Sequence, residues 1–113
     1  MQVTVTLTVD TANPPKWIKF ELDQEPIDLS KCKDDEDVTW KLATTSGWTF
    51  TEDSGHKSNG VVIKNHANKF KDKKGGSRKD HTWQRQGTGG TYRYTISVTD
   101  GTHTASWDPT IRN

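Results

Sequence analysis

The sequence predicts an all-β protein, a single antiparallel β-sandwich of about seven or eight short strands. Two observations support this prediction. Apolar residues repeat with a period of two along several short segments, and turn residues separate these segments about every ten positions. No window of about twelve residues shows the apolar spacing of an amphipathic helix. The length of 113 residues is typical of one domain, so we expect a single domain over residues 1–113.

The first two strands are predicted on either side of a proline break. Val and Leu alternate with Thr over residues 3–9, and apolar residues alternate again over residues 17–22. Between them, Asn13-Pro14-Pro15 predicts a corner, because proline fits neither a helix interior nor a central strand.

Four further segments are predicted in the middle of the chain. Residues 27–29 alternate weakly, whereas Asp37–Ala43 alternates clearly around Trp40. Residues 48–50 and 61–63 each follow a dipeptide that favours a tight turn, Ser46-Gly47 and Asn59-Gly60.

The clearest hairpin is predicted at the C-terminus. Apolar side chains alternate over residues 92–98, and Asp100-Gly101 favours a two-residue type I′ turn. In that register Ile96 faces Ala105 and Tyr94 faces Trp107, and Asp108-Pro109 ends the last strand. The inward-facing members of the best alternations form the predicted core: Val5, Leu7, Phe20, Trp40, Leu42, Tyr94, Ile96 and Trp107.

Charge is distributed unevenly, although the net charge is only +1. Residues 64–85 contain eight Lys and Arg against two Asp, and residues 21–37 contain eight acidic residues against two Lys. The basic stretch shows no pattern that would bury one face, so we predict a long exposed basic loop at about residues 64–82.

Two stretches resemble the strands of a known sandwich family. EPIDLSKCKDDEDVTWKL at residues 25–42 and YRYTISVTDGTHTASWDP at residues 92–109 resemble strands of cupredoxin-like domains. Immunoglobulin-like sandwiches also place a Trp on a central strand and are the alternative. A blue-copper site needs a Cys thiolate, two His and usually a Met, and residues 84–113 contain neither Cys nor Met. We therefore expect the copper function to be absent.

The sequence contains no recognisable catalytic or metal-binding motif. His56, His66, His81 and His103 are too far apart for usual zinc spacing, and the lone Cys32 has no His nearby in the sequence. We predict a protein that is not an enzyme and that needs no cofactor or metal. No apolar run approaches the roughly 20 residues of a membrane span. A single Cys favours the cytoplasm, or the periplasm if a signal peptide has been removed.

We predict that the protein is a binding or interaction module. The sequence does not specify whether its partner is a protein or another kind of molecule. One alternative is binding of a polyanion or nucleic acid through Lys69–Arg85, because clustered cations beside aromatic rings suit such polymers. Its candidate residues are Lys69, Lys71, Lys73, Lys74, Arg78, Lys79, Trp83 and Arg85. The other alternative is binding of a carbohydrate on exposed Trp rings, with Trp17 and Trp48 as candidates.

Overall fold

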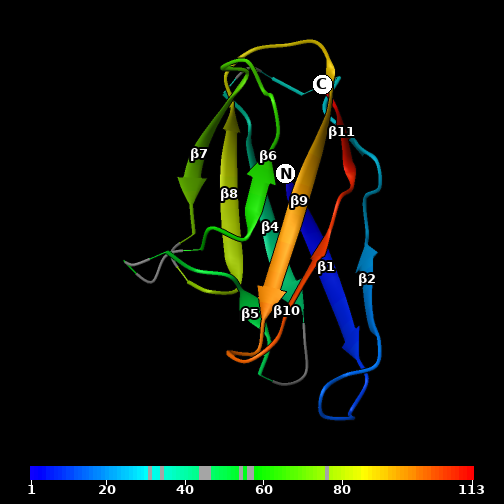
Figure 1. The fold of residues 1–113 in the computed structure, drawn as a ribbon. Coiled ribbons are helices and arrows are strands. Elements are labelled where there is room, and N and C mark those ends of the chain that lie inside the picture. Colours follow the sequence, from blue (N-terminus) through cyan, green and yellow to red (C-terminus); the bar gives the residue numbers. More distant parts are fainter. Residues whose placement is uncertain (31, 34, 44–46, 54, 56–57, 76) are drawn as a thin grey trace.

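Two β-sheets face each other in the computed structural model, which describes residues 1–30, 32–33, 35–43, 47–53, 55, 58–75 and 77–113 (Figure 1). Their inward side chains form one hydrophobic core. Among the described residues there is no helix, and therefore none that could cross a membrane. The predicted all-β sandwich is confirmed.

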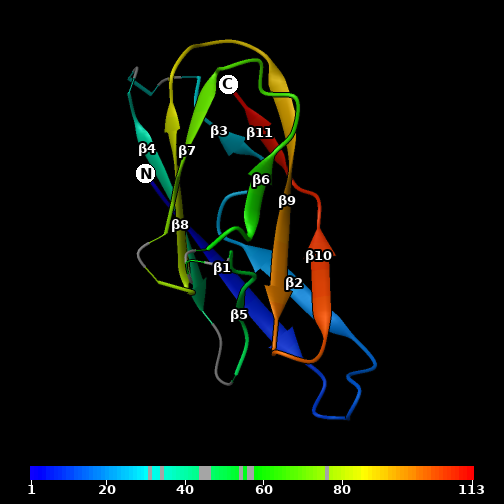
Figure 2. The ribbon, with the colours of Figure 1, turned by 60° about the vertical axis from the view of Figure 1, so that its left-hand side comes forward.

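The first sheet has five strands in the order β2-β1-β4-β8-β7. Their bounds are β1 (Gln2–Val9), β2 (Ile18–Leu22), β4 (Asp37–Ala43), β7 (Phe70–Lys74) and β8 (Asp80–Arg85). The second sheet contains β3 (Ile27–Asp28), β5 (Thr49–Phe50), β6 (Val61–Ile63), β9 (Thr91–Thr99), β10 (Thr104–Trp107) and β11 (Thr110–Arg112). The long β9 organises this sheet, because β10, β11, β5 and β6 all pair with it (Figure 2).

Two strand pairs are parallel, so the sheets are mixed rather than purely antiparallel. β1 pairs in parallel with β4, and β3 pairs in parallel with β11. Parallel neighbours need a long connection, and the chain between β1 and β4 supplies one by passing through β2 and β3. Alternation of apolar residues reports which face is buried but not the direction of the neighbouring strand, so the sequence pattern missed this feature.

The core contains most of the residues predicted for it. Trp40 and Ile96 are fully buried, as expected from their alternations. Phe20 and Trp107 are only partly buried and lie against each other, with ring centroids 6.0 Å apart. These two rings belong to β2 and β10, which are edge strands on the same open side of the sandwich.

One aromatic pair in the centre of the core carries unpaired polar atoms. The rings of Trp40 and Tyr94 are 5.2 Å apart, and within the described part of the chain neither the indole N–H nor the phenol O–H forms a hydrogen bond. Burial raises the pKa of the Tyr94 phenol well above its ordinary value. Tyr94 is therefore neutral and contributes mainly through its ring.

The C-terminal hairpin differs from the predicted register. Ile96 lies opposite Trp107 and Val98 opposite Ala105, so the connection contains four residues instead of two. The Asp100 carboxylate accepts hydrogen bonds from the backbone N–H groups of Thr102 and His103, which stabilises the wider turn.

The chain also continues past Asp108-Pro109 into a further strand. β11 pairs with the first half of β9, and the Pro109 carbonyl accepts a hydrogen bond of 3.0 Å from the Tyr94 N–H. Proline lacks an N–H but keeps its carbonyl, so it does not end the pairing along β9.

The prediction of a long basic loop at about residues 64–82 is wrong, because β7 and the first half of β8 lie within that range and pair as a hairpin. His81, Trp83 and Arg85 alternate along β8 as buried side chains. Two of these three residues are polar, which hides the alternation from any search for apolar residues. They can lie in the interior because each has hydrogen-bonding partners there.

Candidate functional site

Two residues of the predicted polyanion site are structural. Trp83 is buried, and its indole N–H donates a 2.8 Å hydrogen bond to the Val61 carbonyl. Arg85 is only 1% exposed. Its Nε donates to the Asn113 side-chain carbonyl at 2.8 Å, and its guanidinium also donates to the Cys32 carbonyl. Neither side chain is available to a polymer.

Several of the remaining cations of this set form ion pairs. Lys73 lies 3.3 Å from Asp37, Arg78 lies 3.5 Å from Glu52, and Lys74 pairs with Asp53. Lys69 is partly buried. In the described part of the chain, exposed Lys71 and Lys79 have no ion pair.

The acidic and basic stretches of the sequence lie against each other. The Arg85 N–H donates to the Glu36 carbonyl at 2.9 Å, and the Asp35 N–H donates to the Arg85 carbonyl at 3.1 Å. Together with the pair between Lys73 and Asp37, these contacts bring opposite charges to one end of β8. The field of the basic stretch is therefore weakened by neighbouring carboxylates.

The two candidate Trp residues have different surroundings. Trp17 precedes β2 and is 53% exposed, as a stacking platform would be. Trp48 precedes β5 and is buried, with 5% of its surface exposed, so the expectation of an exposed ring there is wrong.

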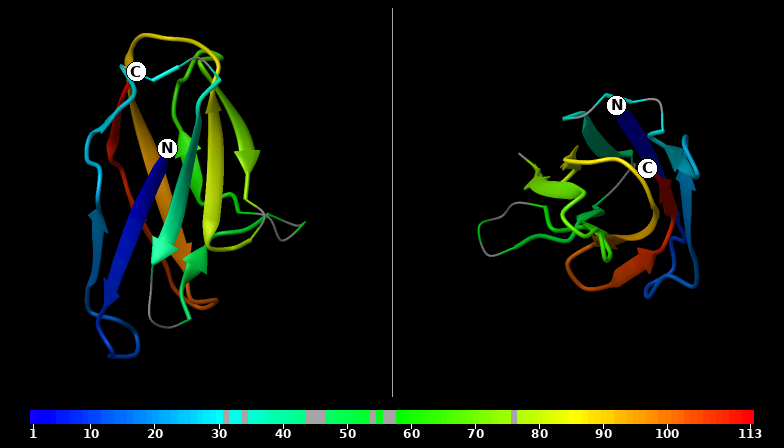
Figure 3. Two further views of the ribbon diagram at one scale, coloured as in Figure 1. Left: turned by 180° about the vertical axis from the view of Figure 1, so that it is seen from behind. Right: turned by 90° about the horizontal axis from the view of Figure 1, so that it is seen from above.

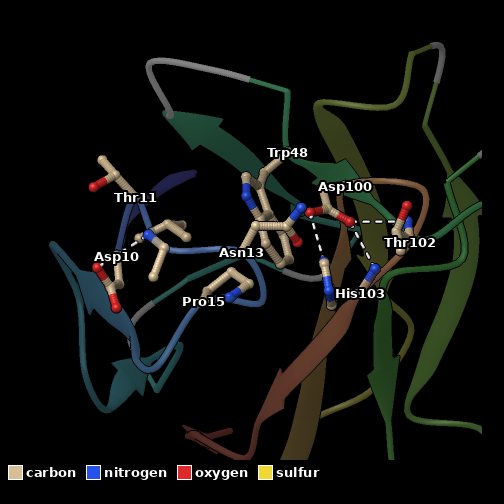
Figure 4. Close-up of a pocket in the computed structure, with 10 residues that line it drawn as sticks. Asp10, Thr11, Asn13, Pro15, Trp48, Asp100, Thr102 and His103 are labelled. Atoms are coloured by element: carbon tan, nitrogen blue, oxygen red, sulfur yellow. Dashed lines mark hydrogen bonds and ion pairs between the residues drawn. The ribbon is translucent and has the colours of Figure 1, made fainter.

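Trp48 nevertheless lines a hollow of about 330 Å³ at one end of the sandwich (Figure 4). Three connections meet there: the one between β1 and β2, the segment before β5, and the turn between β9 and β10. The lining side chains combine one indole with carboxylates, hydroxyls, an amide and an imidazole. They belong to Val9, Asp10, Thr11, Ala12, Asn13, Pro15, Trp48, Asp100, Thr102 and His103.

Both carboxylates of the hollow are oriented by hydrogen bonds from their own connections. Asp10 accepts from the backbone N–H groups of Ala12 at 3.3 Å and Lys16 at 3.0 Å. Asp100 accepts from His103 Nδ1 at 3.0 Å and from two backbone N–H groups. The bond from the His103 side chain, followed by those from the backbone, lowers the pKa of Asp100 to about 2.

Titration of Asp100 should therefore have its midpoint near pH 2 instead of 3.8. A carboxyl whose pKa is lower in the folded state adds stability above its ordinary pKa, and this contribution is lost as the pH falls from about 4 towards 2. Carboxyl carbon shifts measured by NMR would check this value. The pKa should rise towards 3.8 in His103→Ala, and a midpoint near 3.8 in the unchanged protein would contradict the geometry.

A second cluster joins the buried Ser58 and His81 to Asp72, which is exposed on β7. The Ser58 hydroxyl lies 2.8 Å from His81 Nδ1, and His81 Nε2 lies 2.8 Å from an Asp72 carboxylate oxygen. An ionised carboxylate can only accept, so the neutral imidazole carries its proton on Nε2. Its Nδ1 then accepts from Ser58, whose oxygen accepts from the Gly60 N–H at 3.2 Å.

This cluster has the residue types of a hydrolase triad, but its Ser and His side chains are closed off from solvent. Ser58 and His81 are both fully buried. Desolvation is the largest cause that lowers the pKa of His81. The sequence pattern missed the cluster, because 23 residues separate Ser58 from His81 and Asp72 fell within the predicted loop. The alternation along β8 was the signal that could have found it.

The remaining candidates for chemistry contribute no site in the described residues. No group of three or more His, Cys, Asp or Glu side chains is placed there to hold a metal ion. Cys32 is a partly buried free thiol. His56 lies outside the described residues.

No protein-family model and no curated protein matches this sequence.

Proposed function

We propose that the protein is a non-enzymatic binding module, and that the hollow between the connections holds a neutral, hydroxyl-rich ligand such as a saccharide unit. One observation carries this proposal: polar groups of several kinds converge, from three connections, on a hollow with an indole wall. Small-molecule sites commonly combine an apolar wall with a few converging polar groups in this way.

The chemistry of the hollow favours hydroxyl groups over anions. Asp10 and Asp100 are acceptors held in place by backbone N–H groups, and sugar hydroxyls donate well to such carboxylates. A phosphate or sulfate would be repelled by the same two charges. A volume of about 330 Å³ lies near the lower end of the roughly 300–1,000 Å³ range of ligand pockets.

The surroundings of the catalytic-looking cluster support a binding function rather than hydrolysis. A nucleophile must reach its substrate, and the fully buried Ser58 hydroxyl is already engaged with His81 and Gly60. The cluster satisfies buried polar groups, as such networks in protein cores do.

The sheet topology favours a cupredoxin-like over an immunoglobulin-like sandwich. The immunoglobulin arrangement builds one sheet from the antiparallel set ABED and the other from CFG. Here the parallel pair of β1 and β4 lies inside one sheet, which that arrangement lacks. This supports the cupredoxin-like member of the two sequence alternatives, without its copper function.

We expect the protein to bind a neutral oligosaccharide, with Asn13→Ala and Thr102→Ala each weakening the affinity about 5- to 10-fold through loss of one hydrogen bond. Titration calorimetry against soluble xylan, cellulose and chitin oligosaccharides, with heparin as the anionic probe, would measure it. Thr88→Ala is the matched control, because Thr88 is exposed and does not line the hollow. Affinity for a neutral sugar should change little with added salt.

Other results would replace the proposed ligand. Salt-sensitive binding to heparin that is lost in Lys71→Glu would favour the polyanion alternative. Binding of sugar that Trp17→Ala abolishes and Thr102→Ala leaves intact would move the site to the exposed Trp17 ring.

A further inference from the structure

Among the described residues, β2 has one edge that is hydrogen-bonded to β1 and one edge without backbone hydrogen bonds. Beyond its two ends, the Asp10 N–H donates to the Trp17 carbonyl at 3.1 Å and the Asp23 N–H donates to the Thr4 carbonyl at 3.2 Å. Since bonded positions of an antiparallel pair recur every two residues, the odd-numbered residues of β2 point their backbone groups towards β1. The even-numbered residues point theirs away from the sheet.

The backbone groups of Ile18, Phe20 and Leu22 are therefore unpaired within the described part of the chain. β2 is the terminal strand of its sheet, and the views from the front and from behind both show it at the margin of the molecule (Figures 1 and 3). A free edge of this kind is a template for another strand.

The two faces of this edge differ in chemistry. On the inner face, Ile18 and Phe20 line an open groove of about 400 Å³ together with Trp107 of β10. On the outer face, the side chains of Lys19 and Glu21 are 65% and 57% exposed and form an ion pair at 2.7 Å. A strand that fits this edge needs apolar residues on one face and opposite charges on the other.

We propose that the partner of this edge is β2 of a second copy, paired antiparallel about a two-fold axis at Phe20. In this register Phe20 faces Phe20 of the second copy, and Ile18 faces Leu22 of the second copy. All of these residues point their backbone groups outward, so they form the hydrogen-bonded positions of the new pair. The two five-stranded sheets become one continuous sheet.

Charge complementarity selects the second copy and this register. With the axis at Phe20, Lys19 of each copy lies opposite Glu21 of the other, at the closely spaced positions between the bonded ones. Moving the axis to Lys19 sets two lysines opposite each other, and moving it to Glu21 sets two glutamates opposite each other. The charges of the strand are complementary only in this one of the three registers, which is also the one that pairs Ile18, Phe20 and Leu22 all with one another.

Pairing would also cover the partly buried apolar side chains of the edge. The two Phe20 side chains, one from each copy, would lie side by side over the groove next to Trp107. The hollow at the end of the sandwich is lined by other residues, so this interface is independent of the proposed ligand site.

Analytical ultracentrifugation over about 10 μM to 1 mM should show a reversible monomer–dimer equilibrium. Lys19→Glu and Glu21→Lys should each weaken dimerisation roughly tenfold or more, because two attractive pairs become repulsive. The double variant K19E/E21K restores opposite charges and should dimerise like the unchanged protein. The side chains are exposed, so the monomer fold should survive, which circular dichroism and thermal unfolding would verify.

Mixing the two single variants provides the sharpest test. Their edges carry opposite charges, so each variant alone should self-associate more weakly than the unchanged protein, while the mixture should form a heterodimer of at least the original affinity. A monomer at every concentration overturns the proposal. A dimer that Lys19→Glu leaves unchanged also overturns it, because the interface would then lie elsewhere.

Discussion

Replacing Arg85 with methionine is expected to lower the free energy of unfolding by about 3 kcal/mol or more. Arg85 is the last residue of β8. Its buried guanidinium donates to the side chain of the C-terminal residue Asn113 and to the Cys32 carbonyl. Methionine fills much of the space but donates no hydrogen bond, so buried acceptors lose their partner. Urea unfolding followed by tryptophan fluorescence would measure the change.

Lys71→Met is the matched control for Arg85. It removes a positive charge from the neighbouring strand at an exposed position, and its effect should stay within about 0.5 kcal/mol. Arg85→Lys should recover little stability, because an ammonium group does not reproduce the planar fork of donors. A loss below about 1 kcal/mol in Arg85→Met would show that the buried bonds contribute little.

The sequence predicts a strand well where apolar and polar residues alternate. Asp37–Ala43 forms β4 with the predicted bounds, and its Trp40 is fully buried. Along β8 the same geometry is present, but His81 and Arg85 occupy two of the inward positions. The structure tolerates them because distant residues satisfy them, and a local pattern contains no information about those residues.

The prediction of a two-residue turn between β9 and β10 is wrong for a different reason. Asp100-Gly101 is a correct turn signal, and Gly101 does adopt a positive φ of 95°. The register was set by side-chain bonds: Asp100 caps the turn at His103, and the Thr99 hydroxyl donates to the His103 carbonyl at 2.7 Å. These competing bonds widen the loop, and turn propensity alone does not weigh them.

The candidate sites were harder to predict than the strands, because residues far apart in the sequence form them. Lys73 and Asp37 are 36 positions apart, and they meet because β8 lies between β7 and β4. The apparent basic region is consequently matched by carboxylates, which its local charge count could not indicate. The hollow is lined by residues from the segments 9–15, 48 and 100–103, so no single segment of the sequence could have predicted it.

Replacing His81 with leucine is expected to lower the free energy of unfolding by about 2–3 kcal/mol at pH 8. The free energy of unfolding of this variant should also decrease less steeply as the pH is lowered. Leucine leaves the buried Ser58 hydroxyl without its acceptor and Asp72 without its donor. In the unchanged protein, burial keeps the pKa of His81 below its ordinary value of 6.5. The unfolded chain therefore binds this proton first, so stability is complete above pH 6.5 and falls as the pH drops below it.

The expected loss from this one group is at most about 1.4 kcal/mol per pH unit. Urea unfolding of the unchanged protein, His81→Leu and Ser58→Ala between pH 8 and 4 would separate the contributions. Ser58→Ala removes the hydroxyl but keeps the imidazole, so its stability should still fall below pH 6.5. The cluster would not control acid stability if His81→Leu followed the same pH curve as the unchanged protein, because the buried imidazole would then be titrating as it does in the unfolded chain.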